Sequence, residues 1–165
     1  MVAAGALAIT FLLAPDTAGS RLPSYRVAIR DSALEASVKQ AVAGARRRME
    51  QKACAGLLSD LEDEDGRPLD ARVAALRTTA PDYVELVHFR DGSGVARCQR
   101  TGILAVTMPG SRVVWMCPRF ALEHKRDPGL SEAVVLHEVL HTLGLGENPP
   151  TPAEITTQVV RRCGR

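Results

Sequence analysis

Hydrophobic residues recur at three- and four-residue spacing between Asp31 and Ala55, which is the pattern of an amphipathic helix. Ser32 and Glu35 have the spacing of a capping box, so they mark the expected start of this helix. The apolar positions are Leu34, Val38, Ala41, Val42, Ala45, Met49 and Ala53. We therefore expect one face of the helix to pack against a hydrophobic core.

A charged stretch, "SDLEDEDGRPLD" at 59–70, follows this helix. Its acidic residues raise the question of calcium, but Leu61 stands where an EF-hand loop requires an aspartate. A solvated loop is therefore the favoured interpretation. After it, "DARVAALR" at 70–77 predicts a short helix that ends before Pro81.

From residue 83 the pattern changes to that of β-structure. "YVELVHF" at 83–89 predicts a strand, and "RDGSG" at 90–94 predicts the turn after it. His88 lies in this strand and is only a minor candidate for chemistry. "GILAVTM" at 102–108 and "RVVWMC" at 112–117 predict two antiparallel strands joined at "PGS".

Helices are expected again in the last third of the chain. "PRFALEHKRDPG" at 118–129 predicts a short helical or irregular connection in which His124 is exposed. Asp127 and Pro128 have the types of an N-cap and a first helical residue, and the helix they begin should end at Gly144. A C-terminal helix should start at Thr151. The elements together predict an α+β fold with a small mixed sheet.

The composition of the chain is that of an ordinary globular protein. Its 165 residues suit one domain, expected at 21–165; 45% of them are hydrophobic and 24% are charged, which excludes a multi-span membrane protein. The formal net charge is +2 and aromatic residues make up 4%, so nothing favours a nucleic-acid partner. The basic runs at 46–48 and 161–162 are interpreted as solvated helix faces.

The first fourteen residues, "MVAAGALAITFLLA", are apolar and carry no charged side chain. This length is too short to span a bilayer and matches the hydrophobic region of a signal peptide, so residues 1–20 are predicted to be one. The alternative is a buried N-terminal strand or helix. A signal peptide implies a secreted or periplasmic protein with no stable membrane insertion after the signal is removed.

Four cysteines are spread along the chain without a close pair. In a small exported protein an even number predicts disulfides, and three pairings are open. Cys98 and Cys117 flank the predicted strand pair, which favours a bond between them and leaves Cys54 with Cys163. Structural zinc sites usually use closely spaced cysteines, so these four are poor zinc ligands.

The stretch "HEVLHTLGLGENPP" at 137–150 carries the candidate chemistry. His137 and His141 lie four residues apart, so both project from one helix face and can bind a single metal ion. Glu138 projects about 100° further around the helix, where it can accept a proton from water activated by the metal. Nearly every other direction around this helix is apolar, so the polar groups should be buried, and buried polar groups need partners.

A catalytic zinc ion needs a third protein ligand and an open position. Glu147 is the nearest candidate, because Gly144 can end the helix with a positive φ and let the chain turn back. Asn148 is a candidate to orient Glu147.

"HEVLHTLGLGE" resembles the zinc-binding motif of the zincin metallopeptidases, and within them the metzincin pattern H-E-x-x-H-x-x-G-x-x-H/D. His137, Glu138, His141 and Gly144 match position by position, and Glu147 occupies the third-ligand position as a glutamate. The chain is also similar to small exported bacterial proteins that end in "LHTLGLGENPP". Metzincins have a methionine turn after the third ligand, whereas all four methionines here precede the motif.

The zincin resemblance implies a fold with an N-terminal helix, a mixed sheet, a buried active-site helix and a short C-terminal helix. It also implies one zinc ion and hydrolysis of peptide bonds, with peptides or proteins as substrates. In zincins an edge strand pairs with the substrate; "SRVVWMC" at 111–117 or the strand before it is the candidate. Trp115 is a candidate subsite residue, although a strand tryptophan is more often part of the core.

Two other interpretations remain open. One is a zincin-like module that binds zinc for stability or interaction and hydrolyses nothing. The other is a disulfide-stabilised domain whose histidines are satisfied by hydrogen bonds without a metal.

Overall fold

A small four-stranded sheet and a set of helices make up the protein. The computed structural model describes residue 1, residues 26–147 and residues 149–164. The elements in chain order are β1 (Arg26–Ala28), α1 (Ser32–Met49), α2 (Lys52–Ala55), α3 (Leu57–Asp60), α4 (Leu69–Ala75), α5 (Ala80–Leu86), β2 (His88–Asp91), the 3₁₀ helix η1 (Ala96–Gln99), β3 (Ala105–Val106), β4 (Val113–Met116), α6 (Phe120–Arg126), α7 (Pro128–Thr142) and α8 (Pro152–Cys163). The predicted signal peptide at 1–20 lies, apart from Met1, outside the described residues.

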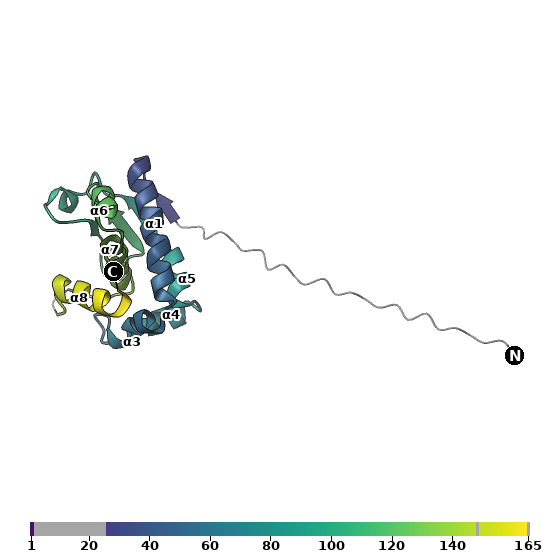
Figure 1. Ribbon diagram of the computed structural model, residues 1–165. Coiled ribbons are helices and arrows are strands. Elements are labelled where there is room, and N and C mark those ends of the chain that lie inside the picture. Colours follow the sequence, from purple (N-terminus) through teal and green to yellow (C-terminus); the bar gives the residue numbers. More distant parts are fainter. Residues whose placement is uncertain (2–25, 148, 165) are drawn as a thin grey trace.

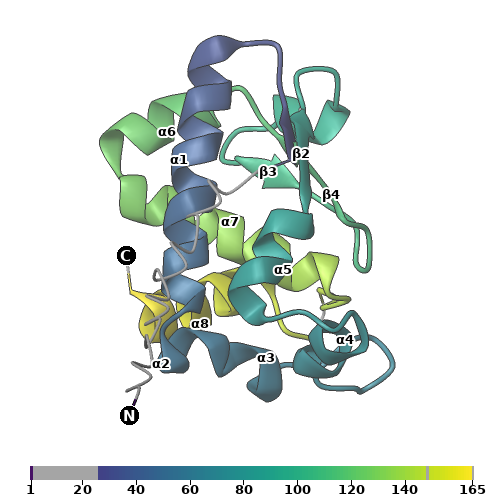
Figure 2. The same ribbon diagram turned by 90° about the vertical axis from the view of Figure 1, so that its right-hand side faces the viewer.

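The sheet is mixed, which confirms the predicted α+β class. Its strand order is β1-β2-β4-β3; β1, β2 and β4 are parallel, and β3 pairs antiparallel with β4. Figures 1 and 2 show the strands in the upper half of the molecule beside α1, with α2, α3, α4 and α8 in the lower half. The helix α7 packs against α1, α6 and α8 and also contacts β3 and β4.

The first long helix begins one residue earlier than its capping-box pattern suggests. Asp31, not Ser32, is the N-cap: its non-helical backbone places the carboxylate where Oδ1 accepts from the Leu34 N–H at 2.7 Å. The expected end at Ala55 is also wrong, because α1 ends at Met49. The extended backbone of Gln51 then redirects the chain into α2, where Cys54 bonds to Cys163 of α8.

The strand predicted at 83–89 is mostly a helix. Thr79 caps α5 by accepting from the Asp82 N–H, and Pro81 lies in the first turn. These start signals outweigh the β-branched and aromatic residues that favoured a strand, and Tyr83 is instead buried in the helical core. The tyrosine hydroxyl donates to the Thr142 carbonyl at 3.2 Å, so α5 contacts the end of α7.

The predicted antiparallel strand pair is confirmed in a shorter form. The strands β3 and β4 pair at Ala105–Met116 and Val106–Trp115, and the turn between them contains Gly110 with φ +76°. The "SRVVWMC" strand is internal, since β4 lies between β2 and β3. Of the two candidate strands, the one before it, β3, therefore lies at an edge of the sheet, opposite β1.

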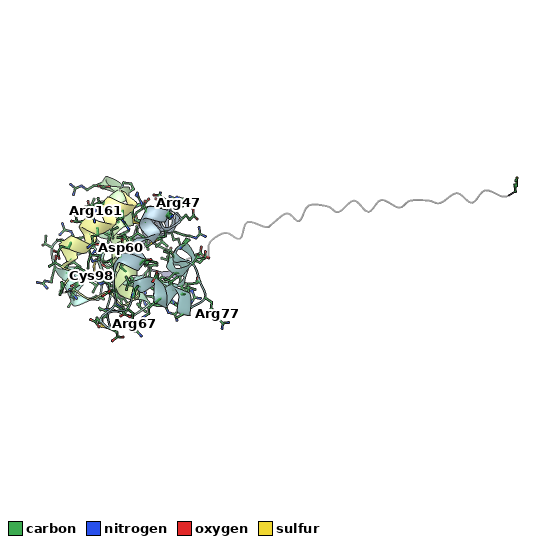
Figure 3. All side chains as sticks on the ribbon, turned by 90° about the horizontal axis from the view of Figure 1, so that it is seen from below. Arg47, Asp60, Arg67, Arg77, Cys98 and Arg161 are labelled. Carbon is green, nitrogen blue, oxygen red and sulfur yellow. A yellow bond between two sulfur atoms is a disulfide. The ribbon has the colours of Figure 1, made fainter. Side chains whose placement is uncertain are left out.

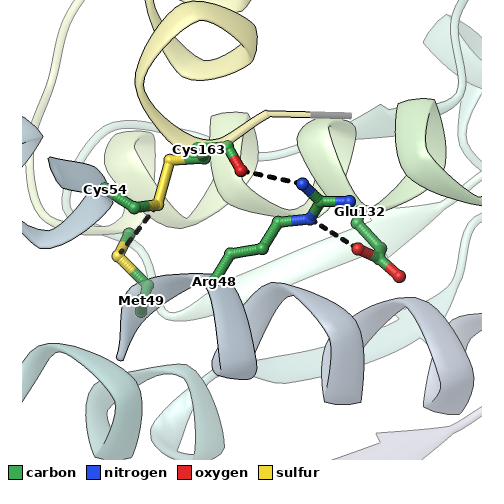
Figure 4. The surroundings of a disulfide bond; sticks show 5 residues. All are labelled: Arg48, Met49, Cys54, Glu132 and Cys163. Carbon is green, nitrogen blue, oxygen red and sulfur yellow. Dashed lines mark hydrogen bonds and ion pairs between the residues drawn. A yellow bond between two sulfur atoms is a disulfide. The ribbon is translucent and has the colours of Figure 1, made fainter. Parts of the chain in front are cut away.

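Two disulfide bonds connect distant parts of the chain, and they have the favoured pairing of the three. Cys54 bonds to Cys163, and Cys98 bonds to Cys117. Figure 4 shows the first bond beside Arg48, whose guanidinium contacts both the Cys163 carbonyl at 2.8 Å and Glu132 at 2.5 Å. Disulfides of this kind are typical of oxidising compartments.

The buried apolar side chains form one cluster between α1, α7, α8 and the inner face of the sheet. Basic residues lie outside it: Arg47, Arg67, Arg77 and Arg161 are exposed (Figure 3). Within the two basic runs, the interpretation as solvated faces is correct for Arg47 and Arg161 but wrong for Arg46, Arg48 and Arg162, which are partly buried and form ion pairs with acidic neighbours. Within 26–147 and 149–164, none of the helices combines the length and apolarity that crossing a membrane requires.

Candidate metal and hydrolytic site

The helix α7 carries the two histidines at the centre of the fold. As the sequence predicted, Asp127 caps it by accepting from the Leu130 N–H at 2.9 Å, and Pro128 is in its first turn. The helix ends at Thr142, shortly before Gly144, where its end was predicted. Every residue from Val135 to Thr142 is buried. The expectation of a helix surrounded by other elements is therefore confirmed, and His137 and His141 are buried with it.

The imidazole rings of His137 and His141 meet through their Nε2 atoms, which lie 3.0 Å apart. Each Nδ1 atom has a separate partner on the protein. His141 Nδ1 donates to the Leu145 carbonyl at 2.7 Å, because a carbonyl can only accept, and this leaves Nε2 of neutral His141 as the acceptor. His137 Nδ1 lies 3.0 Å from the Thr156 hydroxyl of α8. Both rings are thus oriented as histidines are when Nε2 binds a metal.

Gly144 reverses the chain directly after α7. Its φ of +106° is unfavourable for residues with a side chain, and a Cβ there would lie 3.0 Å from Asp63 Cβ. The reversal brings the Leu145 carbonyl to His141 and returns Glu147 toward the histidines. Glu147 Oε1 lies 3.4 Å from His141 Nε2.

These distances allow a test of whether zinc fits the site. Two ligand atoms that each lie 2.0–2.1 Å from a tetrahedral zinc ion are about 3.3 Å apart. The His137–His141 and His141–Glu147 contacts, at 3.0 and 3.4 Å, are close to that value, and the three ligand atoms all lie within 4.8 Å of one another. Two imidazole nitrogens and a carboxylate are also a donor set that zinc accepts. The residues present therefore fit the ion, although an Nε2–H···Nε2 hydrogen bond would satisfy the two histidines without it.

The ionisation of the buried histidine and glutamate is shifted in opposite directions. Burial, with a smaller contribution from the neighbouring His141, lowers the pKa of His137 to about 4, so its ring is neutral near neutral pH. Burial, followed by the charge of Glu147, raises the pKa of Glu138 to about 8, and nearby Arg97 acts in the opposite sense. Carboxyl groups that serve as general acids or bases often have pKa values raised in this way.

A cavity of about 210 Å³ opens over the histidines and Glu138. The edge strand β3, through Ala105 and Val106, forms one wall together with the following Thr107. The helix α8 forms another wall through Pro152 and Thr156. The loop between η1 and β3 also contributes, with Arg97 from η1. Glu138 therefore shares one open space with all three candidate ligands.

Other residues considered from the sequence lie elsewhere. His88 is bonded to Arg26 on β1, with 3.1 Å between His88 Nε2 and Arg26 Nη1. His124, expected to be exposed, is 8% exposed, because it stacks on Phe120 and its Nε2 lies 3.1 Å from the Gln40 side chain. Trp115 is 39% exposed and lines neither the core nor the cavity. Asn148 lies outside the described residues.

Sequence reasoning missed Thr156, Arg97 and the backbone carbonyl of Leu145. The helical spacing of Pro152 and Thr156 places both on one face of α8, but only the packing of α8 on α7 shows that this face meets the site. Nothing in the local sequence distinguishes Arg97 from the other arginines.

The chain matches no protein-family model, no curated protein and no solved structure. The function of the site must therefore be inferred from its own residues.

Proposed function

We propose that the protein is a zinc-dependent hydrolase of peptide bonds, with His137, His141 and Glu147 as zinc ligands. The observation that carries the proposal is that three ligand atoms converge within 4.8 Å in a cavity that Glu138 also lines. A purely structural zinc site has no need of a free carboxylate beside an open position. An amphipathic first helix, a mixed sheet with an antiparallel edge strand and an H-E-x-x-H helix also support a zincin-like fold.

Glu138 has the role of general base and then general acid in this proposal. Zinc, when bound, supplies Lewis acidity to the carbonyl oxygen of the substrate and to the attacking water. Glu138 accepts a proton from that water as its oxygen attacks the peptide carbon. The same carboxyl group then gives the proton to the amine nitrogen as the C–N bond breaks, so one water is consumed per bond.

The edge strand β3 is positioned to hold the substrate. Within the described residues β3 pairs with β4 on one side only, and its residues line the cavity. An extended peptide can add to the open side of β3 through backbone hydrogen bonds. We propose a secreted or periplasmic location. The two disulfides support it, and a peptide substrate is compatible with it.

Zinc content and peptide hydrolysis, measured side by side on five proteins, test this function. The wild type is expected to purify with about one zinc per chain and to cleave a mixed peptide library. Glu138→Gln should keep the zinc and lose at least about a hundredfold in kcat/KM. His141→Ala and Glu147→Ala should lose zinc, whereas the control His88→Ala should behave as the wild type because His88 lies outside the site.

Each other result has a definite meaning. Less than a tenth of an equivalent of zinc in the wild type contradicts a zinc site and favours histidines satisfied by hydrogen bonds. A full equivalent of zinc with no hydrolysis of any peptide favours the non-catalytic module. Undiminished zinc affinity in Glu147→Ala shows that the third ligand is another group.

A further inference from the structure

Arg97 is an exposed cationic side chain at the wall of the candidate site. It lies on η1 and lines the cavity that contains His137, His141 and Glu138. The next residue, Cys98, is buried and bonded to Cys117, directly after β4. The Arg97 carbonyl also accepts from the Arg100 N–H at 3.2 Å. The disulfide and the turn fix the backbone from which the guanidinium reaches the cavity.

No acidic side chain forms an ion pair with Arg97 within the part of the chain that the structure describes. The partly buried Arg46 and Arg48 differ in this respect, since Arg46 binds Glu85 and Arg48 binds Glu132. The charged residues that line the cavity, besides the histidines, are Arg97, Glu138 and Glu147. With a zinc dication bound and both carboxyl groups ionised, the cavity has one positive charge in excess.

We propose that Arg97 selects substrates that carry a carboxylate near the scissile bond. The inference rests on the proposed peptide hydrolysis and names its substrate class. A guanidinium with free donors binds a carboxylate through paired N–H···O bonds, which a neutral amide cannot reproduce with equal strength. The carboxylate is either an acidic side chain or the free C-terminus of the peptide, because both present the same chemical group.

Matched peptides distinguish these two sources. One set carries Glu, Gln or Lys at each position from three residues before to three residues after the cleaved bond. A second set is identical in its interior and ends in a carboxylate or an amide. In one of the two sets, we expect the wild type to have a kcat/KM about tenfold or more higher for the carboxylate peptide than for the matched amide. Charge-assisted hydrogen bonds provide a preference of this size.

Variants of Arg97 should change this preference in a graded way. In Arg97→Gln, the ratio of kcat/KM for the Glu peptide to kcat/KM for the Gln peptide, or for the acid to the amide, should fall to about one. Arg97→Lys should retain part of the preference, and Arg97→Glu should invert it in favour of Lys. Arg100→Gln is the matched control, since Arg100 is exposed in the same segment and does not line the cavity. A uniform loss of kcat for all peptides in Arg97→Gln would contradict selection by charge.

Binding to the zinc-loaded Glu138→Gln protein separates this inference from the proposed hydrolysis. Calorimetry should show tighter binding of the carboxylate peptide than of its amide, and Arg97→Gln in the same background should remove the difference. If the wild type cleaves nothing but this difference persists, the hydrolase proposal fails and the inference about Arg97 stands. If peptides are cleaved or bound without any dependence on the carboxylate, or if none is bound, the inference about Arg97 is wrong.

Discussion

The hydrogen bonds at the Nδ1 atoms decide what the two histidines can do. His141 must donate from Nδ1, because its partner is the Leu145 carbonyl, and its Nε2 is therefore free to accept. His137 has a hydroxyl partner, Thr156, which can accept or donate. The orientation of His137 for a metal thus depends on a side chain from another helix.

Replacement of Thr156 tests this dependence. Thr156→Val keeps the shape of the side chain but removes the hydroxyl, and we expect about tenfold weaker zinc binding because partners of this kind usually contribute ten- to a hundredfold. Competition with a chromophoric chelator measures the affinity. Thr156→Ser should bind nearly as well as the wild type, and Thr157→Val is the matched control because its hydroxyl bonds only to Ala153 within α8. Equal affinity for Thr156→Val and the wild type would contradict the role.

At this scale the sequence predicts some groups of the site but not all of them. His137, Glu138 and His141 follow from helical periodicity, because residues on one helix have fixed relative directions. Gly144 follows from the conformational freedom that a chain reversal needs. Thr156 could not be predicted, because it is 19 residues from His137 in the sequence. Only the packing of α8 on α7 brings the two side chains into contact.

Among the elements, the loop at 61–68 supports the turn that follows α7. The Glu64 N–H donates to the Gly144 carbonyl at 3.3 Å, and the Cβ atom of the buried Asp63 lies close to Gly144. Asp63 Oδ1 accepts from the N–H groups of Asp65 and Arg67, both at 3.0 Å. The acidic loop therefore has a structural task beside the site, and its aspartate is ordered by donors within the loop.

The pH dependence of stability should show the contribution of Asp63. The Arg67 backbone N–H, with the Arg67 guanidinium and the Asp65 N–H, lowers the pKa of this carboxyl against the effect of burial. A carboxyl whose folded-state pKa is lowered stabilises the protein above its unfolded value of about 3.9, and this stabilisation is lost as the pH falls through the folded value. Asp63→Asn should therefore have a lower free energy of unfolding than the wild type at pH 7. This difference, the stability gap, should narrow below about pH 4.

Urea unfolding of EDTA-treated protein at pH 7 and pH 3 measures this gap without the contribution of a metal. Asp65→Asn is the control, because Asp65 is exposed in the same loop. A gap of equal size at both pH values would show that the charge of Asp63 does not stabilise the fold.

The elements also show where periodicity fails as a guide. Residues 83–86 have β-type composition, yet Thr79 and Pro81 start a helix through them, because an N-cap and a proline in the first turn fix the backbone before the later residues contribute. The start of α7 was predictable because Asp127 and Pro128 agree with the apolar pattern that follows.

At the scale of the whole molecule, the two disulfides have separate tasks. The Cys54–Cys163 bond connects residues 109 apart and holds α8 against α2, whereas the Cys98–Cys117 bond spans 19 residues and holds η1 beside the cavity. The favoured pairing was predictable for Cys98 and Cys117 because they flank an antiparallel strand pair. The other pair then followed by elimination, without any indication of which helices it would join.

Removal of each bond should therefore have different consequences. By the loss of chain entropy in the unfolded state, Cys54→Ala/Cys163→Ala should lower the free energy of unfolding by about 5 kcal/mol, and Cys98→Ala/Cys117→Ala by about 3 kcal/mol. Urea unfolding gives both values. The second variant should show the larger change in preference among peptides, since it releases the segment that carries Arg97. A larger loss of unfolding free energy in Cys98→Ala/Cys117→Ala than in Cys54→Ala/Cys163→Ala would contradict these separate roles of the two bonds.

The position of α8 has a consequence for biosynthesis. The helix closes the sequence of elements, yet it provides Thr156 to His137 and Pro152 to the cavity wall, and Cys163 bonds it to α2. A nascent chain that has not yet produced this helix has two histidines without their full support and a cavity that lacks one side. The candidate site is thus complete only after the chain has been synthesised to residue 163 and α8 has packed on α7.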